Sequence, residues 1–127
     1  MSARIEHVAI WARDLEALRA FYTEALGGTS GPRYENAATG FLSYFISLGE
    51  GPRLELMHRP GIEPSRPGAG GYAHIALALG SRPAVDEAVV SLRRRGVVVE
   101  SEPRVTGDGY YEAVILDPEH NRIELTA

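Results

Sequence analysis

The sequence predicts an α+β fold made of two tandem βαβββ modules. The run His7–Ile10 matches His74–Leu77 when the histidines are aligned, and a helical pattern that ends in glycine follows each run. Each copy then closes on nearly the same tetrapeptide, Arg53–Leu56 in the first and Arg122–Leu125 in the second. An internal repeat of this kind indicates that one supersecondary unit occurs twice.

Composition narrows the classes of protein to consider. The 127 residues suit a single domain with one substantial core. The formal net charge of −4 argues against a nucleic-acid partner, which would need a basic face. There is no cysteine, so a disulfide framework, a thiolate nucleophile and a zinc-thiolate site are excluded. No apolar run approaches the roughly 20 residues of a membrane span and the N-terminus lacks a signal-peptide pattern, so we expect a cytoplasmic protein without membrane contact.

The first module is expected over about residues 4–58. Its alternating, β-branched start predicts a strand over Arg4–Ala12. Asp14 is a suitable N-cap for a helix that runs to about Leu26, where two glycines end it. Three shorter strands should follow, over Gly31–Glu35, Phe41–Leu48 and Pro52–His58.

The second module, over about residues 72–127, repeats this order within the same single domain. A segment rich in proline and glycine, residues 59–71, is interpreted as the linker between the halves. A strand is expected over Tyr72–Leu79, and Ser81 with Pro83 should start the helix. The remaining strands are expected near Val97–Val105, Tyr110–Leu116 and Arg122–Thr126.

Two histidines and two glutamates occupy equivalent positions of the two halves: His7, Glu55, His74 and Glu124. Strand alternation turns them away from their aliphatic neighbours, which we expect to pack under the helices. Two imidazoles and two carboxylates balance the charge of one divalent cation, and borderline ions such as Zn²⁺, Ni²⁺ or Co²⁺ accept this mixture of ligands. An octahedral shell would keep two positions for water or substrate oxygens, as catalytic sites do.

Each of these residues has a more ordinary interpretation when it is taken alone. A single histidine on a strand is more often a hydrogen-bonded wall residue, and a glutamate between leucines usually lies on the solvent face. The recurrence of both types in both halves favours a metal site. We expect no ligand role for His58, which points to the face opposite Glu55, or for His120 in a turn.

Over essentially its whole length the chain resembles the vicinal oxygen chelate superfamily, which includes glyoxalases, bleomycin-resistance proteins and dioxygenases. The order His-Glu-His-Glu is similar to that of bacterial glyoxalase I, lactoylglutathione lyase. Besides the two His and Glu segments, the resemblance rests on Asp14-Leu15, Phe21-Tyr22, Leu26-Gly27, Asp117-Pro118 and Asn121.

The resemblance implies that His7, Glu55, His74 and Glu124 bind one Ni²⁺ or Zn²⁺, with Co²⁺ or Mn²⁺ as alternatives, at sites on the interface of a homodimer. The implied reaction is isomerisation of the hemithioacetal of methylglyoxal and glutathione. The metal would bind two adjacent substrate oxygens and stabilise an enediolate while a carboxylate moves a proton between neighbouring carbons. Glu124 is the expected catalytic carboxylate, and Glu55 shares the role through the pseudo-symmetry.

The positions that hold glutathione in that family differ here. Glyoxalase I commonly has an arginine four residues after the first histidine and an asparagine four residues after the first glutamate, where this chain has Trp11 and Arg59. Trp11 can line a pocket but cannot pair with a carboxylate, whereas Arg59 can bind an anion. Tyr110 and Tyr111 are further candidate substrate contacts, although an ordinary role for an aromatic residue in a hairpin is more frequent.

Three classes of function stay open. One is a metal-dependent lyase or isomerase of glyoxalase I type. Another is a different metalloenzyme of the superfamily. An acyl-CoA epimerase has a similar ligand set, often with Gln at the position of Glu55, whereas antibiotic thiol transferases and ring-cleaving dioxygenases use only three ligands. The last is a metal-free protein that binds a drug or metabolite in a dimer cleft, although such proteins typically lack the ligand residues. The fold alone cannot choose the substrate.

Overall fold

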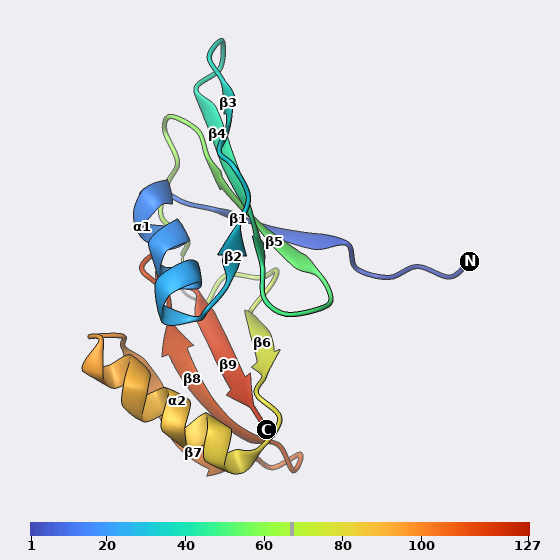
Figure 1. Ribbon diagram of the computed structural model, residues 1–127, viewed down its shortest axis with the longest axis vertical. Coiled ribbons are helices and arrows are strands. Elements are labelled where there is room, and N and C mark those ends of the chain that lie inside the picture. Colours follow the sequence, from blue (N-terminus) through green and yellow to red (C-terminus); the bar gives the residue numbers. More distant parts are fainter. Residues whose placement is uncertain (67) are drawn as a thin grey trace. The chain divides into compact units, whose positions relative to one another are not determined.

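The computed structural model describes residues 1–66 and 68–127, which divide into two compact units, Met1–Ser65 and Arg66–Ala127. Each unit contains one mixed sheet and one main helix (Figure 1). The predicted α+β class and the tandem βαβββ arrangement are therefore confirmed. Neither helix in the described part of the chain has the length and apolar character that a membrane span requires.

The first unit is built on a sheet with the strand order β1-β5-β4-β2, to which β3 adds by pairing with β4. Strands β1 and β5 run parallel, and the other pairs are antiparallel. The elements are β1 (His7–Trp11), α1 (Leu15–Ala20), the π-helical turn η1 (Phe21–Ala25), β2 (Thr29–Ser30), β3 (Tyr34–Asn36), β4 (Phe41–Ser47) and β5 (Arg53–His58).

The first helix starts where the sequence predicts but changes its character halfway. Asp14 is the N-cap, and its Oδ1 accepts a hydrogen bond from the backbone N–H of Ala17 at 3.1 Å. The prediction of a single α-helix to Leu26 was wrong, because the α-helix ends at Ala20 and a π-helical turn follows. The hydroxyl of Thr23 donates to the carbonyl of Arg19 at 2.9 Å, and back-bonding of this kind bends helices.

The strand predicted over Gly31–Glu35 is also different in the structure. Two short strands, β2 and β3, replace it, and both pair with β4. Pro32 lies between them and has no N–H to donate to a ladder, so continuous pairing is interrupted there.

The second unit has a sheet with the order β6-β9-β8-β7, and α2 lies across one face of it (Figure 1). Ser81 caps α2 by accepting from the backbone N–H of Ala84 at 3.2 Å, and Pro83 lies in the first turn. The elements are β6 (His74–Ala78), α2 (Arg82–Arg94), β7 (Val99–Val105), β8 (Tyr111–Leu116) and β9 (Arg122–Thr126).

Each unit has an aliphatic core between its helix and one face of its sheet. The largest fully buried side chains of the first unit are Leu18, Tyr22, Ile46 and Leu56. Those of the second unit are Val85, Ile115, Ile123 and Leu125. The opposite face of each sheet therefore carries the alternate residues, among them the histidines and glutamates singled out above.

The two units repeat the same strand register. In the parallel pair β1–β5, His7 lies opposite Arg53, and in β6–β9, His74 lies opposite Arg122. Two residues further along, Ala9 lies opposite Glu55 and Ala76 opposite Glu124. The sequence repeat therefore corresponds to two units with the same strand pairing.

Candidate functional site

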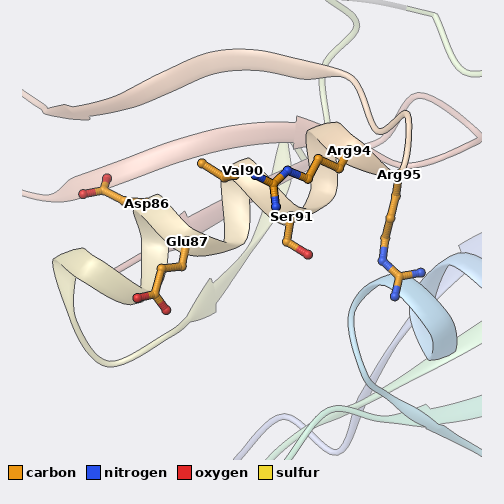
Figure 2. Close-up of a pocket in the computed structure, with 6 residues that line it drawn as sticks. All are labelled: Asp86, Glu87, Val90, Ser91, Arg94 and Arg95. Carbon is orange, nitrogen blue, oxygen red and sulfur yellow. The ribbon is translucent and has the colours of Figure 1, made fainter.

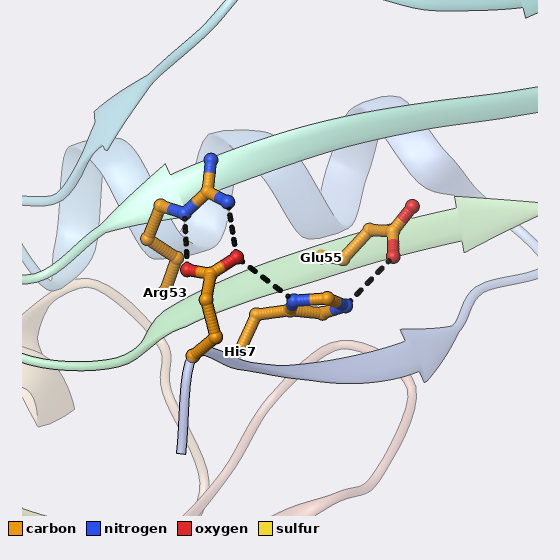
Figure 3. Close-up of polar contacts among 4 residues, drawn as sticks. His7, Arg53 and Glu55 are labelled. Atoms are coloured by element: carbon orange, nitrogen blue, oxygen red, sulfur yellow. Dashed lines mark hydrogen bonds and ion pairs between the residues drawn. The ribbon is translucent and has the colours of Figure 1, made fainter. Parts of the chain in front are cut away.

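The first unit brings His7 and Glu55 together on the open face of its sheet. They come from adjacent parallel strands, and the Nε2 atom of His7 lies 3.5 Å from Oε1 of Glu55 (Figure 3). Ala9, which lies directly beside Glu55, has only a methyl group and so leaves room for the imidazole and the carboxylate to meet.

The other nitrogen of His7 is held by a carboxylate of its own. Nδ1 lies 3.1 Å from Oε1 of Glu6 (Figure 3). Arg53 donates two hydrogen bonds to the same carboxylate, from Nη2 to Oε1 at 2.5 Å and from Nε to Oε2 at 3.2 Å. The hydrogen bond from Arg53, and secondly the one from His7, lowers the pKa of the Glu6 carboxyl. An ionised carboxylate can only accept, so this contact favours the His7 tautomer with the proton on Nδ1, in which the lone pair of Nε2 can bind a cation.

The ring of Phe45 completes the surroundings of His7. Its centroid lies 5.4 Å from the imidazole centroid in an edge-on arrangement. Phe45 also lies opposite Glu55 in the β4–β5 ladder, so both side chains share the open face of the sheet. The orientation of the His7 imidazole is therefore defined by an aromatic ring as well as by two carboxylates.

The second unit repeats the pair with His74 and Glu124. Nε2 of His74 lies 3.1 Å from Oε1 of Glu124. The side chains are 39% and 20% exposed, against 38% and 17% for His7 and Glu55, so the two pairs sit at the same depth. Ala73 stands where the first half has Glu6, and Nδ1 of His74 has no hydrogen-bond partner within the described residues.

A further carboxylate, Glu112, accompanies the second pair and was not singled out from the sequence. In the β8–β9 ladder Val114 lies opposite Glu124, and Glu112 is two residues earlier on the same face. Burial, followed by the negative charge of Glu124, raises the pKa of the Glu112 carboxyl. The strand alternation of β8 was the available signal, because it gives Glu112 and Val114 the same face. The first half has the buried Ser43 at the corresponding register position.

Of the four predicted substrate-binding residues, Trp11 and Arg59 lie against each other in the structure. Tyr110 and Tyr111 have different surroundings. Arg59 lies over the indole of Trp11, with the guanidinium carbon 4.6 Å from the ring centroid. Tyr110 is 56% exposed and immediately precedes β8. Tyr111 lies on the helix side of the sheet, where its hydroxyl donates to Asp86 of α2 at 2.5 Å, so it does not share the face of His74.

No group of three or more His, Asp or Glu side chains within residues 1–66 and 68–127 gathers in a way that could hold a metal ion. Each unit offers one histidine and one glutamate as a pair. Each unit thus supplies two of the four ligands that the sequence predicts.

A shallow hollow lies elsewhere, on the exposed side of α2 (Figure 2). All of its lining residues come from one helix and its C-cap, namely Asp86, Glu87, Val90, Ser91, Arg94 and Arg95. A surface supplied by a single helix encloses little of a ligand, whereas ligand sites bury most of theirs. The paired histidines and glutamates remain the candidate site.

Comparisons with known proteins agree with this architecture. Mitochondrial methylmalonyl-CoA epimerase of Bos taurus is 29% identical over 121 residues, which cover 91% of this chain and 67% of that protein. The uncharacterized protein YwkD of Bacillus subtilis is 32% identical over 127 residues, covering 95% and 94% of the two chains.

Among solved structures, the trypanothione-dependent glyoxalase I of Leishmania major superposes with a TM-score of 0.80 at 27% identity. The superposition covers 98% of this chain and 86% of that one. Residues 4–125 match the Glyoxalase/Bleomycin resistance protein/Dioxygenase superfamily. The chain belongs to this superfamily.

Proposed function

We propose that the protein is a divalent-metal-dependent lyase or isomerase of glyoxalase I type. Its substrate is a small molecule with two adjacent oxygens, and the hemithioacetal of methylglyoxal with a thiol is the first candidate. The observation that supports this proposal best is the occurrence of the same His–Glu pair, at the same register and depth, in both halves.

The residues present fit a divalent cation. His7, Glu55, His74 and Glu124 are the proposed ligands, and their two imidazoles and two carboxylates suit Ni²⁺ or Zn²⁺. The contact between Nδ1 of His7 and Glu6 supports the same assignment, because metal-binding histidines commonly donate their second N–H to a carboxylate. By analogy with the bacterial enzymes, we propose a homodimer with the sites at its interface.

The chain's own residues carry the proton transfer in this proposal. Glu124 takes the proton from the substrate carbon that bears the thiol and returns it to the neighbouring carbon. The hydroxyl proton on the first carbon passes to the oxygen on the second, so the carbonyl group changes place without net oxidation. Glu55 holds the equivalent position in the first half and can accept or return the proton on that side. A cation bound by the four ligands would supply positive charge beside the oxygens on which negative charge develops.

Epimerisation of an acyl-CoA is the second candidate, and the relatives named methylmalonyl-CoA epimerase support it. That reaction also begins with removal of a proton next to a carbonyl group. The proton is then returned to the same carbon from the opposite side, and Glu55 and Glu124 together would supply the two carboxylates this requires.

One pair of assays separates these possibilities. The Ni²⁺-loaded protein would be given methylglyoxal with glutathione or another thiol, and in parallel methylmalonyl-CoA in D₂O with deuterium incorporation as the readout. Thioester formation in the first assay supports the lyase. Deuterium uptake at the α-carbon of methylmalonyl-CoA, with no thioester formed from methylglyoxal, supports the epimerase. Absence of both, in a protein that also fails to bind metal, would favour the metal-free binding protein.

The role of Glu124 is tested within whichever reaction is found. Glu124→Gln should reduce turnover by about 10²–10⁴-fold, the usual contribution of a positioned acid–base group, while thermal unfolding stays cooperative. Glu102→Gln is the matched control, because Glu102 is an exposed carboxylate that pairs with Arg93 on the helix. A Glu124→Gln variant with full activity would refute its assignment as the proton carrier.

A further inference from the structure

The open face of the first sheet carries an aromatic cluster with one arginine across it. Trp11 ends β1 and is 41% exposed. Phe41 meets its indole edge-on at 6.3 Å between centroids, and Tyr34 lies 6.0 Å from Phe41. Arg59 covers the indole at 4.6 Å. We refer to these four residues, Trp11, Tyr34, Phe41 and Arg59, as the aromatic platform.

The strand register places the platform on the same face as the first His–Glu pair. Trp11 is four residues after His7 in β1, and Phe41 is four residues before Phe45, which lies opposite Glu55. Side chains an even number of positions apart on a strand share a face. Four residues of strand span roughly 13 Å, so the platform lies about that far from the histidine.

Local hydrogen bonds hold the backbone next to Trp11 and next to Arg59. The N–H of Ala12 donates to the carbonyl of Met57 at 2.7 Å, and Nδ1 of His58 donates to the carbonyl of Ala12 at 2.8 Å. These bonds tie the residue after Trp11 to the end of β5, next to Arg59. Pro60 then restricts the backbone of Arg59 to extended conformations.

Arg59 differs from the other arginine that stacks on this face. Arg53 lies 4.2 Å from the centroid of Phe45, but its guanidinium is already neutralised by Glu6. Within residues 1–66 and 68–127, no carboxylate lies within ion-pair distance of Arg59 and no oxygen accepts a hydrogen bond from it, while its guanidinium carbon lies over the indole of Trp11. The N–H groups of an arginine form a planar fork that suits the two oxygens of a carboxylate or phosphate, and an aromatic ring beside the guanidinium leaves them available.

We infer that the aromatic platform is a binding subsite for a planar anion, a flat unsaturated ring that carries a carboxylate or phosphate group. The anionic oxygens pair with Arg59, and the ring packs against Phe41 and Tyr34. Glutathione offers carboxylates but no ring, so the platform selects against it. In combination with the proposed function, on which this last step rests, the platform binds the end of the substrate that does not react.

The single tryptophan of the chain makes the subsite directly observable. Trp11 fluorescence would be followed in metal-free protein during titration with benzoate, phenyl phosphate, cyclohexanecarboxylate, benzyl alcohol and glutathione, and each titration repeated by calorimetry. We expect benzoate or phenyl phosphate to bind at least tenfold more tightly than cyclohexanecarboxylate, benzyl alcohol or glutathione. The tighter of the two aromatic anions identifies the anionic group.

Variants separate the subsite from general charge. Arg59→Gln should weaken the aromatic anion at least tenfold, and Arg59→Lys should restore only part of the affinity because it cannot form a bidentate contact. Arg94→Gln, an exposed arginine of α2, is the control and should bind like the unmodified protein. Equal affinity for benzoate and cyclohexanecarboxylate, no saturable binding by either method, or equal losses in the Arg59 and Arg94 variants would overturn the inference.

The readout requires neither metal nor turnover, so the two proposals can fail separately. Tight binding of an aromatic anion by a protein without isomerase or epimerase activity would leave the platform in place and reject the proposed function. Turnover by a protein whose Arg59→Gln variant binds benzoate normally would reject the platform alone.

Discussion

Replacing Glu6 by glutamine tests whether His7 is oriented for a metal ion. The carboxylate of Glu6 lies 3.1 Å from Nδ1 of His7 and accepts two hydrogen bonds from Arg53, at 2.5 and 3.2 Å. The amide of Glu6→Gln has nearly the same size but no negative charge, and one of its two oxygens is replaced by a nitrogen that cannot accept. The contact that favours a proton on Nδ1 of His7 should therefore be weakened while the fold is preserved.

The expected size of the effect follows from the number of affected ligands. Loss of an outer partner of a metal-binding histidine typically lowers metal affinity by about 10–100-fold. Among the described residues, His7 has such a carboxylate and His74 does not, since Ala73 takes the place of Glu6 in the second half. We therefore expect a loss near the lower limit, about tenfold, which competition with a chromophoric chelator for Ni²⁺ can measure.

The second half supplies the control for this experiment. Arg122 occupies the register position of Arg53 and pairs with Glu100 at 2.6 Å, but no histidine hydrogen-bonds to Glu100 in the part of the chain that the structure describes. Glu100→Gln removes a similar exposed ion pair and should leave Ni²⁺ affinity unchanged, since such pairs contribute little to stability. Unchanged affinity in Glu6→Gln, or an equal loss in both variants, would refute the orienting role of Glu6.

Two further predictions concern stability. The hydroxyl of Tyr44 donates to Glu16 at 2.7 Å, which raises the pKa of the phenol. This hydrogen bond stabilises the fold fully below about pH 10, where the phenol of the unfolded chain is also protonated. The stabilisation is lost as the pH rises through the pKa of Tyr44 in the folded protein. Urea unfolding should show this alkaline decline in the parent protein and a smaller one in Tyr44→Phe. In Gly28→Ala the new Cβ would lie 2.7 Å from the carbonyl oxygen of Tyr22, so the free energy of unfolding should fall by about 1–3 kcal/mol. Gly31→Ala, whose Cβ would make an ordinary 3.8 Å contact, should change it far less, and equal effects would contradict the packing argument.

The periodic features of the sequence were sufficient for most of the fold. Alternation and capping residues located the strands and the starts of both helices, because burial of one face requires a fixed period. The end of the first helix was not predictable in this way. Whether Thr23 bonds back to Arg19 depends on side-chain geometry, which a hydrophobic pattern does not contain.

The repeat also pointed to the four residues that the structure arranges as two equivalent pairs. What surrounds those pairs depended on strand register, which brings residues distant in sequence side by side. Glu112 shares a face with Glu124 through the β8–β9 ladder, and Arg59 reaches Trp11 because β1 and β5 are parallel neighbours. The hydrogen bond from Tyr111 to Asp86 depends on how α2 packs on its sheet, which the sequence pattern does not contain.

The most direct test of the proposed centre is its metal stoichiometry. Purified protein would be loaded with Ni²⁺, freed of excess metal and analysed for nickel per chain, together with His7→Ala and His74→Ala. We predict one nickel per chain in the parent protein and an equally complete loss in both variants, because each histidine supplies one ligand from its own half. A variant that keeps its full metal content, or a parent protein that binds none, would contradict a centre shared by the two halves.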